Sequence, residues 1–109
     1  MKLLVTVVQD QDAPRLLEAL MEKNYRATKL ASTGGFLRGG NTTMLVGIED
    51  SQIDEVISII RGICHPRQKT VTPIPPLGGA AESYVPYPIE VSVGGATVFI
   101  LDVDQFIKI

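Results

Sequence analysis

The segment from Thr33 to Asn41 combines residue types that suit the binding of a phosphate-bearing ligand. Four of its residues are glycines, which adopt positive φ angles and can turn successive backbone N–H groups toward an anion. Between the glycines stand an apolar pair, Phe36-Leu37, and a cation, Arg38, so amides for a phosphate lie beside a platform for a base. The pattern indicates a nucleotide site. The alternative interpretation is a flexible glycine-rich hairpin in which Phe36 caps the core.

The residues that flank this segment offer further polar groups. Asn24, Arg26 and Thr28 are spaced at i, i+2 and i+4, so they share one side of an extended chain. Arg26 offers a forked donor to a phosphate or a base edge, and Thr28 offers a compact hydroxyl. Asn41 carries both a donor and an acceptor, which suits an adenine edge. The alternative is that Arg26 and Thr28 belong to a solvated strand face.

The sequence gives little support for catalysis or metal binding. Cys64 and His65 are adjacent, so their side chains point in different directions, and Cys64 completes an apolar helix face as a buried structural cysteine. One cysteine and one histidine make no metal-ligand cluster. Asp102 and Asp104 have no nucleophile nearby and are interpreted as solvated strand ends. We therefore expect a protein with no catalytic residue, no metal and no cofactor, and not an enzyme.

A second long connection runs from about residue 65 to residue 88 and holds six of the seven prolines. Loops beyond about 12–15 residues are usually functional or disordered. This one contains Leu77-Gly78-Gly79 and the run Tyr84-Val85-Pro86-Tyr87-Pro88. Two interpretations stand side by side: a mobile lid that orders when ligand binds, or a proline-stiffened cover over a sheet edge.

Hydrophobic periodicity predicts the elements that position these segments. The valine-rich run from Leu3 to Val8 indicates a strand buried on both faces. Asp12 is expected to cap a helix that ends near Asn24, and a Ser51/Asp54 capping box to start a second helix that ends at His65-Pro66. Further strands are expected at 27–32, 42–49, 89–93 and 97–102, the last two around a Gly94-Gly95 turn.

This order, β-α-β-β-α-β with an extra strand near the end, predicts an α+β, ferredoxin-like fold over residues 1–109 as one domain. Two helices cover only one face of such a sheet. The first and last strands nevertheless carry apolar residues on both faces, among them Leu3, Val5, Phe99 and Leu101. A monomer would expose a large apolar patch, so we expect identical subunits to pack sheet against sheet in a closed ring.

Charge and composition limit the partners. A formal net charge of −2 argues against a nucleic-acid polymer, which needs a basic face. The apolar run at the start is short for a signal peptide, and no segment approaches the roughly 20 apolar residues that span a bilayer. The single cysteine fits a reducing compartment. We expect a cytoplasmic protein that does not insert into membranes.

Several stretches together resemble one family. Tyr25 to Thr43 closely resembles the PII-like cyclic di-AMP receptor proteins of the PstA/DarA family, and so do residues 7–12, 84–91 and 93–99, so the likeness spans the chain. The tail from Thr97 to Asp104 is similar to the end of the broader PII signalling family. The chain departs from ordinary PII proteins in its short second-to-third strand connection. It also has Gly94-Gly95-Ala96-Thr97 in place of a Gly-Asp-Gly-Lys motif, which speaks against ATP and 2-oxoglutarate sensing.

The resemblance implies a PII-like homotrimer that binds three cyclic di-AMP molecules in the clefts between subunits and relays occupancy through loop ordering to an unknown downstream partner. It implies these ligand contacts: Asn24, Arg26, Ala27 and Thr28 lining the cleft, Gly35, Phe36 and Leu37 covering the ligand, Asn41 and Gly47 at an adenine, and Phe99 as an apolar contact. Alternatives are a related trimer that binds ATP or ADP or hydrolyses a nucleotide, and an assembly or metal-tolerance protein of similar shape.

Overall fold

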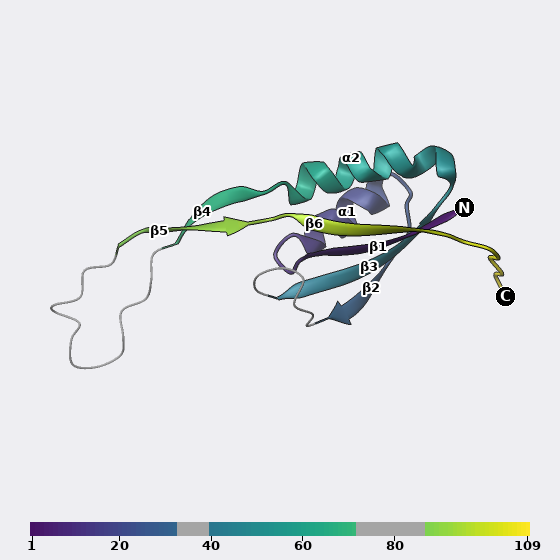
Figure 1. Ribbon diagram of the computed structural model, residues 1–109, viewed down its shortest axis with the longest axis horizontal. Helices are drawn as coiled ribbons and strands as arrows, with labels where there is room; N and C mark the ends of the chain where they lie inside the picture. Colours follow the sequence, from purple (N-terminus) through teal and green to yellow (C-terminus); the bar gives the residue numbers. More distant parts are fainter. Residues whose placement is uncertain (33–39, 72–86) are drawn as a thin grey trace.

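The computed structural model describes residues 1–32, 40–71 and 87–109 of the chain (Figure 1). Residues 33–39 and 72–86 lie outside the described residues, so the expectations for Gly35, Phe36 and Leu37, and for a lid, stay predictions. The elements are β1 (Lys2–Gln9), α1 (Ala13–Glu22), β2 (Ala27–Ser32), β3 (Asn41–Ile48), a 3-10 turn (Asp50–Gln52), α2 (Ile53–Cys64), β4 (Arg67–Val71), β5 (Ile89–Val93) and β6 (Ala96–Asp102).

Four strands form an antiparallel sheet in the order β2-β3-β1-β6. The register sets Leu4 of β1 between Val46 of β3 and Ile100 of β6. Helices α1 and α2 lie together on one face of this sheet (Figure 1). The mixed α+β architecture is compatible with the predicted ferredoxin-like fold, since the last strand of the chain pairs with the first.

The hydrophobic core lies between the two helices and the sheet. Leu4 and Val8 of β1 and Val46 of β3 are fully buried, because alternate residues of a strand share the face that the helices cover. The helices contribute apolar residues at helical spacing, notably Leu16, Leu20, Val56, Ile60 and Cys64. Burying each large aliphatic side chain stabilises the fold by about 1.5–3 kcal/mol.

The opposite face of the sheet, here called the open face, is also apolar. Leu3 and Val5 of β1 point to this side, and Phe99 and Leu101 pair with them from β6. Phe99 is 46% exposed and Leu101 is 49% exposed, so the described elements leave them largely in contact with water. The expectation of a second apolar face is confirmed for the described residues, whereas the homotrimer inferred from it stays a prediction.

Strands β4 and β5 form a separate two-stranded antiparallel ribbon, here called the arm, which projects beyond the end of the main sheet (Figure 1). Sequence periodicity did not predict β4. The expected Gly94-Gly95 hairpin turn is wrong, because β5 pairs with β4 and β6 pairs with β1. Both glycines have φ near +90°, which only glycine adopts without strain, and they join the two sheets.

The helix ends differ in part from the expectations. Asp12 occupies the N-cap position of α1, but its side chain makes no capping hydrogen bond. The Ser51/Asp54 capping box is wrong, because a 3-10 turn capped by Glu49 precedes α2, and its last residue, Gln52, accepts a hydrogen bond from the Glu49 amide at 2.8 Å. His65 ends α2 as predicted, since the following proline excludes helical geometry. Within the described residues, α1 and α2 span 10 and 12 residues, too few to cross a membrane.

Candidate functional site

A cavity of about 410 Å³ opens on the open face of the sheet, at the end where β2 begins. Arg26 and Thr28 come from β2 and the residue before it, and Gly47 comes from the neighbouring strand β3. Five apolar residues complete its lining: Met1, Leu3, Leu45, Val103 and Phe106. A cation and a hydroxyl therefore stand at the edge of an apolar hollow, which is the general composition of a small-molecule site.

The strand register explains why these residues meet. Thr28 lies opposite Leu45, and Gly47 lies opposite Leu3, so all of them share the open face. A Cβ atom at Gly47 would meet no other atom within 4 Å, and its φ is not positive. The fold of the described residues therefore does not require glycine here. Its missing side chain leaves the cavity open.

Arg26 is exposed and forms no salt bridge with any residue in the described ranges. Its guanidinium can therefore offer its donors to an anion that enters the cavity. The hydroxyl of Thr28, also exposed, adds a second donor close by on the same strand face. This pair suits a phosphate group better than a neutral ligand, because charge-assisted hydrogen bonds are the stronger ones.

Two of the expected contacts on this part of the chain do not line this cavity. Asn24 has a φ of +64° and its amide donates to the Met21 carbonyl, so it ends α1 and is not extended. The i, i+2, i+4 argument therefore fails for Asn24, which does not line the cavity. Ala27 packs against the core on the helix side, so only its backbone faces a ligand on the open face.

Asn41 and Phe99 lie at other parts of the open face. Asn41 is the buried first residue of β3 and is six residues from Gly47, which is about 20 Å along a strand. Phe99 belongs to β6, three strand positions from β2 and hence about 14 Å across the sheet. The structure therefore brings Arg26, Thr28 and Gly47 together within one chain, and it does not bring Asn41 or Phe99 to them.

The tail after β6 supplies residues that sequence reasoning missed. The Val103 amide donates a hydrogen bond to the Met1 carbonyl at 3.1 Å, and an ion pair between Lys2 and Asp102 fastens the end of β6. The Met1 amino group lies 3.3 Å from the Asp50 carboxylate. Strand alternation could have indicated Leu3 and Leu45, but no sequence signal places Val103 or Phe106 in the cavity.

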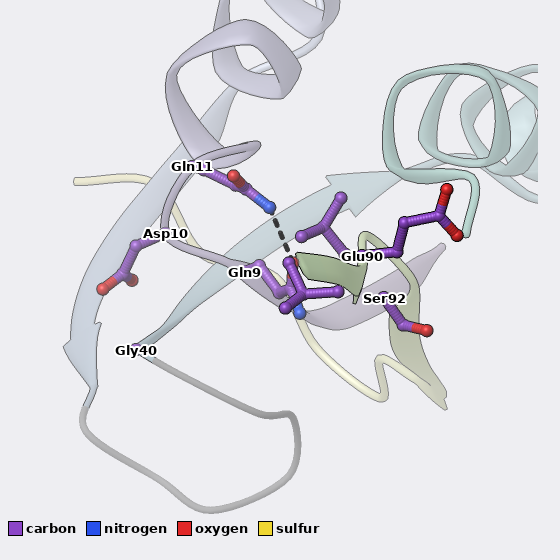
Figure 2. Close-up of a pocket in the computed structure, with 8 residues that line it drawn as sticks. Gln9, Asp10, Gln11, Gly40, Glu90 and Ser92 are labelled. Atoms are coloured by element: carbon purple, nitrogen blue, oxygen red, sulfur yellow. Dashed lines mark hydrogen bonds between the residues drawn. The ribbon is translucent and has the colours of Figure 1, made fainter. Parts of the chain in front are cut away.

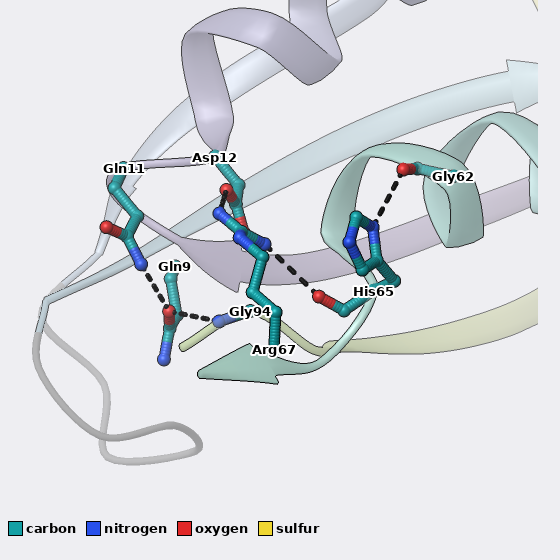
Figure 3. A network of polar contacts seen from close by, with 7 residues as sticks. All are labelled: Gln9, Gln11, Asp12, Gly62, His65, Arg67 and Gly94. Atoms are coloured by element: carbon teal, nitrogen blue, oxygen red, sulfur yellow. Dashed lines mark hydrogen bonds and ion pairs between the residues drawn. The ribbon is translucent and has the colours of Figure 1, made fainter. Parts of the chain in front are cut away.

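The opposite end of the sheet carries a polar network around the turn from Gln9 to Asp12 (Figure 3). The Asp12 carboxylate is 1% exposed and accepts a hydrogen bond from Arg67 Nη2 at 2.7 Å. Arg67 Nη1 also donates to the His65 carbonyl at 3.1 Å. The side-chain oxygen of Gln9 accepts from the Gly94 amide at 2.7 Å. These bonds fix the root of the arm to the turn.

The same turn holds the residues next to segment 33–39. The Asp10 carboxylate accepts a hydrogen bond from the Thr42 hydroxyl at 2.6 Å, and the Asp10 amide donates to the Gly40 carbonyl at 3.0 Å. A side chain at Gly40 would meet the Asp10 carboxylate, which would have to move to admit it. Three residues of the turn, Gln9, Asp10 and Asp12, thus contact the bases of both long connections.

A second cavity of about 630 Å³ lies between this turn and the arm (Figure 2). Gln9, Asp10 and Gln11 line one side, and residues 90–93 of β5 line the other. Gln11 donates to the Gln9 side-chain oxygen at 3.0 Å, which holds both amides in place. Carboxylates on both sides, Asp10 and Glu90, make this cavity less suited to a phosphate than the one beside Arg26.

The groups considered for chemistry are placed for other roles. Burial, and next the charge of Asp12, raise the pKa of Cys64 to about 11, so the thiol is protonated at neutral pH. The hydrogen bond from Lys2 lowers the pKa of Asp102, which favours its anionic form. Among the described residues no group of three or more His, Cys, Asp or Glu side chains could hold a metal ion.

Comparison with known proteins agrees with a small ligand receptor. A family model described as cyclic-di-AMP receptor matches residues 1–109, the full length of the chain. A crystal structure of a functionally unknown protein from Pediococcus pentosaceus ATCC 25745 is similar, with 45% sequence identity and a TM-score of 0.80. The similarity covers 99% of this chain and 96% of that chain.

Proposed function

We propose that this chain, which belongs to the cyclic-di-AMP receptor family, binds cyclic di-AMP at the Arg26 cavity, in a cleft that a second subunit completes. The observation that carries the proposal is the convergence of Arg26, Thr28 and Gly47 on one cavity of the open face. The family match supports the ligand, and the chemistry of the lining supports the place.

One phosphate and one base of the ligand have counterparts in the lining. Arg26 pairs with a phosphate of the dinucleotide, and the Thr28 hydroxyl donates a second hydrogen bond. The space above Gly47 accepts a base against the apolar side chains of Leu3 and Leu45. The volume of about 410 Å³ falls within the usual range of roughly 300–1,000 Å³ for ligand pockets.

We infer a second subunit because one chain does not bring all of the expected ligand contacts to the cavity. Asn41 and Phe99 resemble ligand contacts of the family, yet Asn41 lies about 20 Å from Gly47 and Phe99 lies about 14 Å from β2 by strand geometry. A neighbour packed on the apolar open face would bring its own Asn41 or Phe99 toward the cavity. A ring of three subunits repeats this contact three times and closes without a free end.

The polar turn offers a route for relaying occupancy. Asp10 contacts Gly40 and Thr42 next to segment 33–39, and Asp12 contacts Arg67 at the root of the arm. A change at one connection therefore shifts groups that hold the other. A downstream partner then responds only as far as it binds the two states with different affinity. We infer a cytoplasmic, non-enzymatic role in signal transduction.

Titration calorimetry tests the ligand. Purified protein is titrated separately with cyclic di-AMP, cyclic di-GMP and ATP, and light scattering measures the mass of the particle. The proposal predicts saturable binding of cyclic di-AMP, one per chain, to a particle of three chains, with weaker binding of the other two. An absence of heat with cyclic di-AMP at any protein concentration would refute it.

A further inference from the structure

The C-terminal tail crosses from β6 to the cavity and places an aromatic ring there. Val103 and Phe106 line the cavity together with Arg26 and Thr28, although β2 and β6 occupy opposite edges of the sheet. The Val103 amide is hydrogen-bonded to Met1, so the root of the tail is fixed beside β1. The tail thereby brings apolar residues to the site from a part of the sequence that is remote from Arg26 and Thr28.

Phe106 is 66% exposed although it lines an apolar cavity. The fold of the described residues therefore gains little from burying this ring, and most of its surface stays available to a ligand. Arg26 on the same lining supplies the charge that a phosphate needs. A ring beside a cation is the combination by which proteins hold a nucleotide, because the base stacks while the phosphate pairs.

We propose that Phe106 is a ligand-contacting residue of this site, whose ring stacks on one base of the bound dinucleotide. The inference rests on the proposed function, because it needs a nucleotide at the Arg26 cavity. Stacking tolerates any base, so Phe106 contributes affinity, while selectivity for adenine comes from polar groups. The open space at Gly47, on the same lining, gives the base room to enter.

The next residue of the tail provides a matched control. Ile107 is 75% exposed and does not line the cavity. Substitutions at positions 106 and 107 therefore change similar exposed apolar surface on the same tail, but only the first changes the site. The chain has no tryptophan, so Phe106→Trp and Ile107→Trp each introduce a single tryptophan, which can be excited apart from the three tyrosines.

Calorimetry with cyclic di-AMP measures the contribution of the ring. Phe106→Leu keeps an apolar side chain but removes the aromatic face, and we expect its affinity to fall about 5- to 150-fold, the range that stacking on one base supports. Ile107→Ala should bind as the wild type does. Phe106→Trp should retain affinity, because the larger ring still stacks.

Fluorescence locates the contact independently of affinity. Cyclic di-AMP should change the emission of Phe106→Trp in a saturable manner, and it should change that of Ile107→Trp much less. If the wild type binds but Phe106→Leu binds equally well, or if both tryptophans respond alike, Phe106 is not a contact and the proposed function survives. If the wild type itself binds no cyclic di-AMP, the proposed function fails first and the inference with it.

Discussion

Replacing Gly47 by alanine should raise the stability of the free protein but lower its affinity for the ligand. Gly47 lies within β3, has no positive φ, and has open space where a Cβ would stand. Glycine within a strand destabilises a protein by roughly 0.5–1 kcal/mol relative to alanine, because glycine loses more conformational freedom on folding. Gly47→Ala should therefore stabilise the free protein by about this amount, which raises Tm by about 2–8 °C for a domain of this size.

The same methyl group occupies space that the proposed base needs. Forcing extra atoms into a filled site typically costs about 1–3 kcal/mol, so affinity for cyclic di-AMP should fall about 5- to 150-fold. Gly47→Val projects two more methyl groups into the cavity and should bind more weakly still. Melting followed by circular dichroism measures the first effect, and calorimetry measures the second.

Gly62 on α2 is the control, because a Cβ there also meets no atom within 4 Å. It lies on the helix side of the sheet, away from the cavity. Gly62→Ala should stabilise the protein by about 1 kcal/mol, the helix-propensity difference, and leave ligand affinity unchanged. Wild-type affinity in Gly47→Val, with the assembly intact, would refute the placement of the ligand.

Three further predictions follow from individual contacts. Arg26→Ala removes a charge-assisted contact and should weaken cyclic di-AMP binding by about 1.5–3 kcal/mol in calorimetry, whereas Lys29→Ala, on the other face of β2, should not. Arg67→Ala leaves the buried Asp12 carboxylate without its donor and should lower the free energy of unfolding by about 1–3 kcal/mol in a urea titration; an unchanged midpoint would contradict this. Because burial raises the pKa of Cys64 from 9.0 to about 11, its contribution to stability is complete below pH 9 and is lost as the pH rises through 11. Native protein at pH 8 should therefore react with iodoacetamide far more slowly than urea-unfolded protein, as mass spectrometry would show, and equal rates would contradict the burial of Cys64.

Sequence patterns predicted most of the strands and both helices. The bounds of β2 and of β5 and the end of α2 agree with the expectation, because their apolar residues recur at strand or helix spacing. Strand β4 was missed because its residues, from Arg67 to Val71, alternate without a buried face and pair only with β5. The Gly94-Gly95 hairpin was wrong for a related reason: the partner of each strand is set by distant segments.

The candidate site was predicted in part. Arg26 and Thr28 share a strand face, so alternation alone sets them side by side. Gly47 was expected only from the family resemblance, and the register of β3 in the structure places it beside them. The alternation failed at Asn24, where a left-handed residue ends the helix. Phe106 was missed because a tail without periodicity gives no local sign of where it crosses the sheet. All the ligand contacts remain predictions, and those assigned to Gly35, Phe36 and Leu37 lie outside the described residues.

A crystal structure of the protein with cyclic di-AMP tests the central claim most directly. Electron density for the dinucleotide should lie between two chains, with a phosphate at Arg26 and Thr28 of one chain and with Asn41 or Phe99 of its neighbour close to the ligand. Density confined to the cavity between Gln9 and β5, or a ligand held by a single chain away from Arg26, would contradict the account.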